Sequence, residues 1–228
     1  GCAWEDVSSQ WVVVSSTGVV YISGDEGNTW SSQQVEPYDG STAVFSKIAA
    51  GNGLIVISND YGQTWESVDG GTTWELAANI GGDRYIVQHL SFTGDKFIAS
   101  VQDSPFDDST SVNKFFVSNA NAAQSSTSAI TVWTESETPP HTGPYTAVTS
   151  SQGTFLAITV NGEVAYSYDA VSWKQLTTLS GTYSGIVGGR FNGGYFVPLK
   201  STTMSDVTIL KKGSPPLARV ITNAGKVS

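Results

Sequence analysis

One eight-residue pattern, S-x-D-x-G-x-T-W, occurs three times in this chain, and a shortened form occurs once more. Self-similarity is the signature of repeat architectures, in which small units pack against their neighbours. Four copies in the same residue order therefore restrict the chain to a repeat fold. The residues of the four copies are Ser23, Asp25, Gly27, Thr29 and Trp30; Ser58, Asp60, Gly62, Thr64 and Trp65; Ser67, Asp69, Gly71, Thr73 and Trp74; and Ser167, Asp169, Ser172 and Trp173.

Each position of the pattern has a physical role in a tight turn. The Asp side chain can accept hydrogen bonds from the backbone N–H groups that follow it, Gly permits a positive φ, and Thr or Ser adds a hydroxyl. The Trp is expected to insert between neighbouring sheets, where it buries a large apolar area. Strand-like runs at 18–23, 53–58 and 160–167 precede three of the copies. The pattern thus predicts β-hairpin turns in an all-β protein.

At these residues the sequence resembles the Asp-box (BNR) repeat family, found in sialidases, sortilin-type receptors, photosystem assembly factors, some glucanases and many phage tail proteins. The resemblance implies a β-propeller of four-stranded blades with the motifs on its outer rim, and it implies no activity. The last copy has Ala170 and Val171 where the longer form has its turn residues. This short form resembles the version common in phage tail proteins.

The repeat spacing predicts about five blades over residues 1–212, followed by an extended basic tail at 213–228. Five blades would hold about 42 residues each, within the ~40–50 of propeller repeats. Trp133 marks a degenerate copy that has lost its Asp. One of the tandem copies, 58–65 or 67–74, is then an extra hairpin.

The two chain ends suggest how the ring closes. Residues 1–7 parallel residues 62–68, so we expect them to form the outer strand of the last blade. Such closure removes exposed edge strands. Trp4 and Trp30 lie close together in the sequence, which predicts a first blade that lacks a strand. The alternative is an incomplete propeller cut from a longer chain, because the chain begins with Gly and not Met.

The charge is negative and unevenly distributed. The chain has 11 Lys+Arg and 20 Asp+Glu, a net charge of −9, which disfavours nucleic-acid partners. Residues 1–174 are acidic, whereas residues 175–228 are basic. The basic end is predicted either to neutralise the acidic blades or to dock onto an acidic neighbouring subunit. Its docking residues would be Lys211, Lys212, Arg219 and Lys226.

No apolar run is long enough to predict a membrane span, and the first residues do not resemble a signal peptide. The single cysteine, Cys2, excludes an internal disulfide. Ser, Thr, Gly, Asn and aromatic residues dominate, which is typical of proteins that work outside a cell.

Sialidase chemistry is the enzymatic alternative, because that family carries the same motifs. Its members bind the sugar carboxylate with three arginines and use a Tyr nucleophile polarised by Glu and an Asp acid/base. This chain has three arginines, Arg84, Arg190 and Arg219, but no match to the arginine-containing N-terminal motif of the family. A shared fold does not carry function, so we expect a non-enzyme. Another paired-carboxylate glycosidase stays open.

Metal and cofactor sites are not predicted. Two histidines, His89 and His141, are too few for a histidine-based metal cluster. His89 alternates with apolar residues and is expected to be a strand residue. Asp103, Asp107 and Asp108 are weak calcium candidates, since calcium needs about six oxygen ligands, and a solvated acidic loop is favoured.

The combined features predict a non-enzymatic recognition or assembly module, located in a virion or outside a cell. We expect a phage tail or capsid-associated protein that binds a host-surface glycan or a neighbouring virion subunit and can form homo-oligomers. A bacterial secreted or periplasmic assembly factor is a further alternative. A glycan site needs aromatic platforms and polar groups in a concavity. The candidate residues for it are Tyr38, His141, Tyr145, Tyr183, Arg190 and Tyr195.

Overall fold

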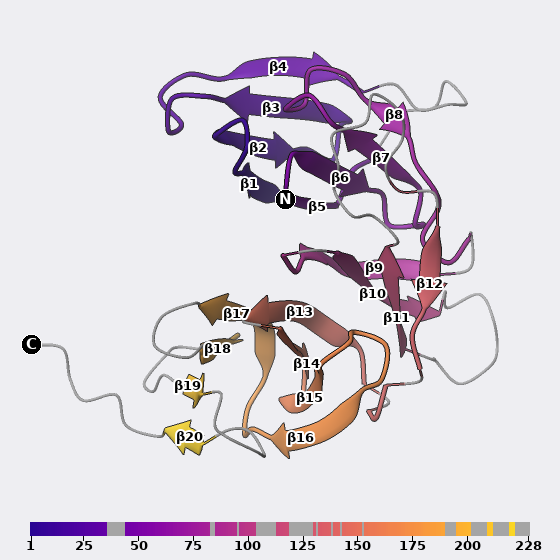
Figure 1. Cartoon of the computed structure of the whole chain (residues 1–228), viewed down its shortest axis with the longest axis vertical. Coiled ribbons are helices and arrows are strands. Elements are labelled where there is room, and N and C mark those ends of the chain that lie inside the picture. Colours follow the sequence, from indigo (N-terminus) through magenta and orange to yellow (C-terminus); the bar gives the residue numbers. More distant parts are fainter. Residues whose placement is uncertain are drawn as a thin grey trace, which may run out of the picture.

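The computed structural model describes residues 1–35, 44–82, 85–94, 96–103, 113–118, 130, 132–137, 139–141, 143–151, 153–189, 195–201, 209–211 and 219–221. These residues form five antiparallel sheets of four strands each and no helix. The all-β prediction is therefore confirmed for them. Figure 1 shows that the sheets follow one another around an arc in chain order.

The sheets are called A to E from the N-terminus. Sheet A holds β1 (Cys2–Glu5), β2 (Gln10–Val14), β3 (Val19–Ser23) and β4 (Ser31–Gln34). Sheet B holds β5 (Lys47–Gly51), β6 (Leu54–Ser58), β7 (Thr64–Ser67) and β8 (Glu75–Leu76). Sheet C holds β9 (Tyr85–Phe92), β10 (Phe97–Asp103), β11 (Asn113–Ser118) and β12 (Trp133–Glu135). Sheet D holds β13 (Tyr145–Ser151), β14 (Thr154–Thr159), β15 (Glu163–Ser167) and β16 (Lys174–Thr178). Sheet E holds β17 (Tyr183–Gly189), β18 (Tyr195–Lys200), β19 (Ile209–Lys211) and β20 (Arg219–Ile221).

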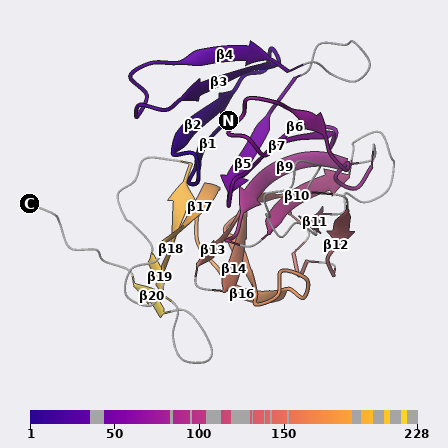
Figure 2. The ribbon, with the colours of Figure 1, turned by 45° about the horizontal axis from the view of Figure 1, so that its top comes forward.

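The first strand of each sheet lies on the inner side of the arc. β1 contacts β5, β5 contacts β9, β9 contacts β13 and β13 contacts β17. Within every sheet the strands then run outward in chain order (Figure 2). In sheets A to D, the turns that join the first and second strands therefore meet at one end of the inner strands.

Side-chain alternation builds an apolar layer between each pair of consecutive sheets. Successive strand side chains point to opposite faces. On β6, Ile55 and Ile57 pack with sheet A, whereas Leu54 and Val56 pack with sheet C. Because sheets B, C and D are covered on both faces, their central strands read as continuous apolar runs rather than as alternating ones.

The predicted closure of the ring by the N-terminus is wrong. β1 pairs with β2 as the inner strand of sheet A, and the fourth strand of sheet E is β20, which pairs with β19. Residues 219–221, predicted in the tail, thus belong to a sheet. The prediction that the first blade lacks a strand is also wrong. Sheet A has four strands, which fit into the short sequence interval because the strands are short and the turns are tight.

Candidate ligand-binding site

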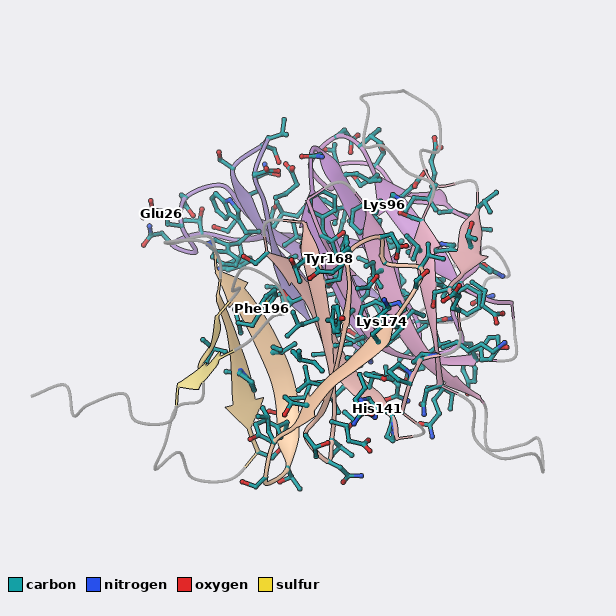
Figure 3. The ribbon with its side chains drawn as sticks, turned by 60° about the horizontal axis from the view of Figure 1, so that its bottom comes forward. Glu26, Lys96, His141, Tyr168, Lys174 and Phe196 are labelled. Carbon is teal, nitrogen blue, oxygen red and sulfur yellow. The ribbon has the colours of Figure 1, made fainter. Side chains whose placement is uncertain are left out.

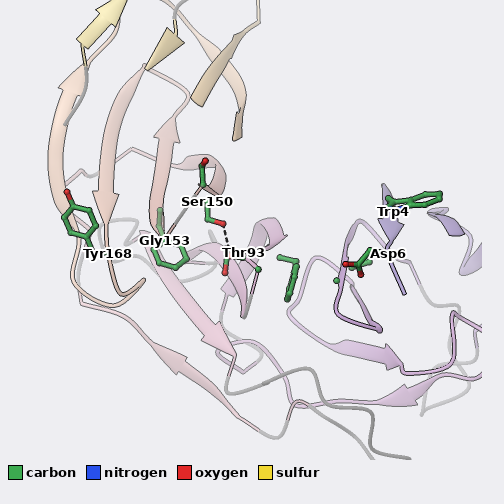
Figure 4. A pocket seen from close by; sticks show the side chains of 12 residues that line it. Trp4, Asp6, Thr93, Ser150, Gly153 and Tyr168 are labelled. Atoms are coloured by element: carbon green, nitrogen blue, oxygen red, sulfur yellow. Dashed lines mark hydrogen bonds between the residues drawn. The ribbon is translucent and has the colours of Figure 1, made fainter. Parts of the chain in front are cut away.

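The turns at the inner ends of sheets A to D surround a cavity of about 670 Å³. Figure 4 shows its walls, which come from segments far apart in the sequence. Aromatic rings, hydroxyls and one carboxylate meet there, a mixture typical of a small-ligand site. The lining residues are Trp4, Asp6, Ala50, Gly51, Phe92, Thr93, Gly94, Ser150, Ser151, Gly153, Phe155 and Tyr168.

Hydrogen bonds link the turns of consecutive sheets around this cavity. Asp6 Oδ1 accepts from the backbone N of Asn52 at 3.1 Å. The side-chain amide of Asn52 donates to the carbonyl of Gly94 at 3.3 Å. Ser150 Oγ donates to the carbonyl of Thr93 at 2.9 Å, the dashed line in Figure 4. These bonds fix the position of one sheet relative to the next, so the cavity walls are preformed.

A buried carboxylate anchors the Trp4–Asp6 segment. Glu5 is 1% exposed and accepts from the backbone N of Ser8 at 2.6 Å and of Gly53 at 2.9 Å. Burial alone would raise the pKa of Glu5, but the hydrogen bonds from Ser8, Val7 and Gly53 outweigh it and lower that pKa. Glu5 is thus a charged clamp between sheets A and B beneath the cavity.

Close backbone packing shapes the floor of the cavity at Gly51. A Cβ atom added at Gly51 would lie 2.0 Å from the ring of Phe92. Only glycine allows the ring to cross the inner strand there. The ring of Phe92 also packs against Phe97, with centroids 4.9 Å apart.

Two aromatic side chains border the cavity and remain exposed. Trp4 is 40% exposed, and its ring lies edge-on to that of Trp11 at 5.3 Å. Tyr168 is 57% exposed and lies edge-on to Tyr166 at 5.6 Å. Each ring is therefore supported on one side and open on the other. Such rings offer stacking surfaces to a ligand.

The turn motifs lie away from this lining except at Tyr168. In the first copy, Asp25 accepts from the backbone N and the hydroxyl of Thr29, at 2.8 and 2.6 Å. Ser23 Oγ donates to Asp25 at 2.8 Å and accepts from the backbone N of Gly27 at 2.8 Å. The hydrogen bonds from Thr29 and Ser23 lower the pKa of Asp25.

The copies at 67–74 and 167–173 contain the same arrangement. Asp69 accepts from the backbone N of Thr73 at 2.9 Å, and Asp169 accepts from the backbone N of Ser172 at 2.8 Å. Ala170 takes the place of glycine with a φ of 62°. All three copies join the third strand of a sheet to its fourth.

The copy at 58–65 has a different structure and is the extra hairpin. It joins β6 to β7, the second and third strands of sheet B. Asn59 Oδ1 accepts from the backbone N atoms of Tyr61 and Gln63, both at 3.0 Å. Asp60 instead forms an ion pair with Lys47 at 3.5 Å. The predicted role of Asp60 in the turn is therefore wrong.

The tryptophans of the fourth-strand turns pack against the preceding sheet. Trp173 of sheet D is 7% exposed and stacks on Phe115 of sheet C, with centroids 4.3 Å apart. Trp133 of sheet C donates its indole N–H to the carbonyl of Ala78, at 2.9 Å. Trp30 differs, because it is 45% exposed. No sheet of the described residues packs on the ring of Trp30, so the predicted insertion of Trp30 between two sheets is not found there.

Three of the predicted ligand residues are buried outside the cavity lining. Tyr145 and Tyr183 are each 1% exposed, and His141 is 8% exposed. Figure 3 places His141 toward the other end of the sheets from Tyr168. His141 Nδ1 lies 3.7 Å from Glu163 Oε1, and burial raises the pKa of Tyr145. These side chains belong to the packed interior.

Other predicted residues lie outside the described part of the chain. This applies to Tyr38, Arg84, Arg190, Asp107 and Asp108, and to the side chains of Asp103, Tyr195 and Arg219. Among the residues that are described, no group of three or more His, Cys, Asp or Glu side chains could hold a metal ion. The described residues also contain no helix that is long and apolar enough to cross a bilayer.

His89 lies on β9 of the inner surface, as the strand prediction requires. Burial, together with the charge of Lys47, lowers the pKa of His89 to about 4. His89 is therefore neutral over most of the pH range.

None of the cavity residues is among the ligand residues predicted from sequence. In the sequence, Trp4 indicates only where a repeat lies, and Tyr168 occupies a variable position of the last motif copy. The available signal was the location of aromatic residues beside turns. Aromatic residues beside turns indicate a binding site only when the structure shows that those turns lie next to one another.

No protein-family model and no curated protein matches the chain. Its fold is nevertheless shared with solved β-propeller structures. The structure of YCF48 bound to D1 peptide aligns with a TM-score of 0.63 and 13% identity, over 97% of this chain and 66% of that chain. YCF48 from Cyanidioschyzon merolae aligns with a TM-score of 0.58 and 14% identity, over 96% and 69%. A chain of the mitotic checkpoint complex aligns with a TM-score of 0.66 and 11% identity, over 100% and 67%.

At these identities the likeness establishes the fold alone. The β-propeller prediction is confirmed at that level. This chain spans about two thirds of the length of those propellers, between 66% and 69% for the three.

Proposed function

We propose that the chain is a non-enzymatic recognition and assembly module, an arc of five Asp-box propeller blades from a virion or another extracellular assembly. The observation that carries this proposal is the cavity of about 670 Å³ at the inner turns. Its rings of Trp4 and Tyr168 supply stacking surfaces, and Asp6, Thr93 and Ser150 supply polar atoms. Paired carboxylates, which a glycosidase needs, are not part of the described lining, where Asp6 is the one carboxylate.

A glycan fits this lining best. Sugars present an apolar face to an aromatic ring and hydroxyls to carboxylates and serines, and the cavity offers both kinds of partner. A host-surface sugar is the ligand that we propose. The acidic character of residues 1–174 favours neutral sugars over sialic acids, because like charges repel.

A glycan array tests this proposal directly. We expect the wild-type protein to bind a set of neutral sugars, and we expect Trp4→Ala and Tyr168→Ala to weaken that binding at least tenfold. Tyr61→Ala is the matched control, since Tyr61 is 62% exposed and lies in the β6–β7 turn. An array without a single hit contradicts the glycan ligand, and turnover of a fluorogenic sialoside contradicts the non-enzymatic function.

A second candidate ligand is a peptide from a neighbouring virion subunit. The solved structure of YCF48 bound to D1 peptide motivates it, since that protein has the same fold. A peptide library displayed on phage tests this ligand. Peptides that bind the wild type and not Tyr168→Ala would support a peptide ligand, and a library without binders would leave the sugar as the candidate.

A further inference from the structure

The cavity is elongated and follows the arc of the sheets. Its lining includes Trp4 of sheet A, Gly51 of sheet B, Phe92 of sheet C and Tyr168, which follows β15 of sheet D. Sheets B and C lie between sheets A and D (Figure 1), and sheets that pack face to face are about 10 Å apart. The rings of Trp4 and Tyr168 are therefore farther apart than one sugar unit can reach.

The cavity is exposed at its two ends and more enclosed in its middle. Trp4 is 40% exposed and Tyr168 is 57% exposed, and Figure 4 shows Thr93 and Ser150 between them. In this middle part Gly51 is buried, and Thr93 and Ser150 are half-buried. A long ligand can therefore cross the cavity and continue past both rings.

The middle of the cavity offers contacts of its own. Ser150 Oγ donates its hydrogen to the carbonyl of Thr93 at 2.9 Å, and its oxygen can still accept a hydrogen bond from a ligand hydroxyl. Phe92 is half-buried, and its ring packs against Phe97 with centroids 4.9 Å apart. This supported ring gives the ligand an apolar surface. Sugar units between the two ends thus find both an acceptor and a ring.

The charges of the lining favour an uncharged ligand. Asp6 is the one charged side chain of the described lining, which contains no Lys, Arg or His. Asp6 Oδ1 accepts from the backbone N of Asn52 at 3.1 Å, which fixes this carboxylate at the sheet A end of the cavity. A carboxylate accepts hydrogen bonds from hydroxyls and repels uronate, sulfate and phosphate groups. An acidic polysaccharide would therefore meet repulsion without a compensating cation.

We propose that the cavity binds an internal segment of a linear, neutral polysaccharide. The segment is on the order of four sugar units long, about one for each of the sheets A to D that line the cavity. Trp4 and Tyr168 stack on its two ends, and the polysaccharide continues beyond both rings. This inference rests on the glycan-binding function proposed above and adds the length of the bound segment and its place within a longer chain.

A length series tests the size of the segment. The probes are linear oligomers of glucose, galactose, mannose and N-acetylglucosamine, each from one to six units, titrated into the full chain by calorimetry. In at least one series we expect the affinity to rise at least a hundredfold between two and four units and to change little beyond that. Equal affinity for two and six units in every series that binds overturns the proposal, and so does binding to none of the four series.

Variants at the two ends test whether one ligand reaches both rings. With a six-unit oligomer of the series that binds, Trp4→Ala and Tyr168→Ala should each raise the Kd at least tenfold. With two units, which cannot reach both rings, at most one of the substitutions should have an effect of that size. Tyr21→Ala is the control, because Tyr21 is an exposed ring of sheet A outside the cavity lining. Tenfold effects of both substitutions on the two-unit ligand overturn the proposal.

Competition by a polymer tests the internal position of the segment. At equal mass, the water-soluble polymer of the same series has far fewer chain ends than the six-unit oligomer. We expect the two to compete equally well, and a polymer that competes at least tenfold more weakly shows that the cavity needs a chain end. The glycan array described above separates this inference from the function on which it rests. Array hits without a length dependence overturn the internal segment alone, whereas an array without hits overturns both.

Discussion

Two neighbouring hairpins of sheet B have the same sequence pattern but different hydrogen bonds. In the turn at 67–74, Asp69 accepts from Thr73 and from Ser67, at 2.9, 2.6 and 2.8 Å. In the turn at 58–65, Asp60 accepts nothing from its own turn, and Asn59 makes the turn contacts instead. The Asp of the motif accepts hydrogen bonds from its own turn only where the motif joins the third strand of a sheet to the fourth. The Ser, Asp and Thr residues of the motif therefore build the scaffold, and the ligand contacts that we propose lie at other positions, of which Tyr168 is a variable one in the last copy.

Among the substitutions that test this comparison, Asp69→Ala is expected to lower the free energy of unfolding the most. The substitution removes three hydrogen bonds to a carboxylate, so we expect a loss of about 2 kcal/mol in the free energy of unfolding. Asp60→Ala removes one exposed ion pair with Lys47 and should cost at most about 0.5 kcal/mol. Urea denaturation measures both. Equal losses would show that the two turns are held in the same way.

Acid should remove the contribution of Asp69. Burial would raise the pKa of this carboxyl, but the hydrogen bonds from Thr73 and Ser67 lower it below its ordinary 3.8. A group with a lowered pKa stabilises the fold above its unfolded value and loses this effect as the pH falls through the folded value. The stability difference between the wild type and Asp69→Ala should therefore be constant near neutral pH and shrink below about pH 4. A difference that persists unchanged in acid would contradict the assigned hydrogen bonds.

Asn59→Ala should cost about 1 kcal/mol, because Asn59 Oδ1 accepts from two backbone N–H groups of its turn. Thermal unfolding followed by circular dichroism measures this change. In the neighbouring turn, Val68→Ala alters an exposed residue at the corresponding position and serves as the control. If Asn59→Ala left the stability unchanged, the hydrogen bonds of Asn59 would not stabilise the turn.

The smallest effect is expected at Ser58. Its hydroxyl is buried and has no hydrogen-bond partner among the residues that the structure describes, so Ser58→Ala should be neutral or slightly stabilising. Ser67 Oγ, at the equivalent position, donates to Asp69 and accepts from Gly71, both at 2.8 Å. Ser67→Ala should therefore cost about 1 to 2 kcal/mol. Chemical denaturation of the two Ala variants side by side compares them, and a destabilising Ser58→Ala would reveal a partner for that hydroxyl.

The sequence predicts local structure in this protein better than long-range structure. The composition and the runs at 53–58 and 160–167 indicate strands, and the motif indicates turns with Asp as acceptor. Those features depend on neighbouring residues. The position of residues 1–7 depends on which strand they pair with, and a Trp-Glu pair occurs both in β1 and in β7.

The cavity depends on long-range structure even more strongly. Trp4, Phe92 and Tyr168 come from sheets A, C and D, and only the convergence of the inner turns brings them together. Two of the tyrosines chosen from sequence, Tyr145 and Tyr183, are instead buried at the first positions of β13 and β17. Burial at those positions follows from the packing of sheet D between its neighbours and not from the local residues.

The central claim is that the motif turns hold the scaffold while the cavity binds the ligand. Measuring both the melting temperature and the Kd for an array-selected sugar in Asp69→Ala and Tyr168→Ala tests it most directly. We predict that Asp69→Ala lowers the melting temperature and keeps the Kd, measured where it is folded. Tyr168→Ala should keep the melting temperature and raise the Kd at least tenfold. Loss of binding in Asp69→Ala together with unchanged binding in Tyr168→Ala would contradict the claim.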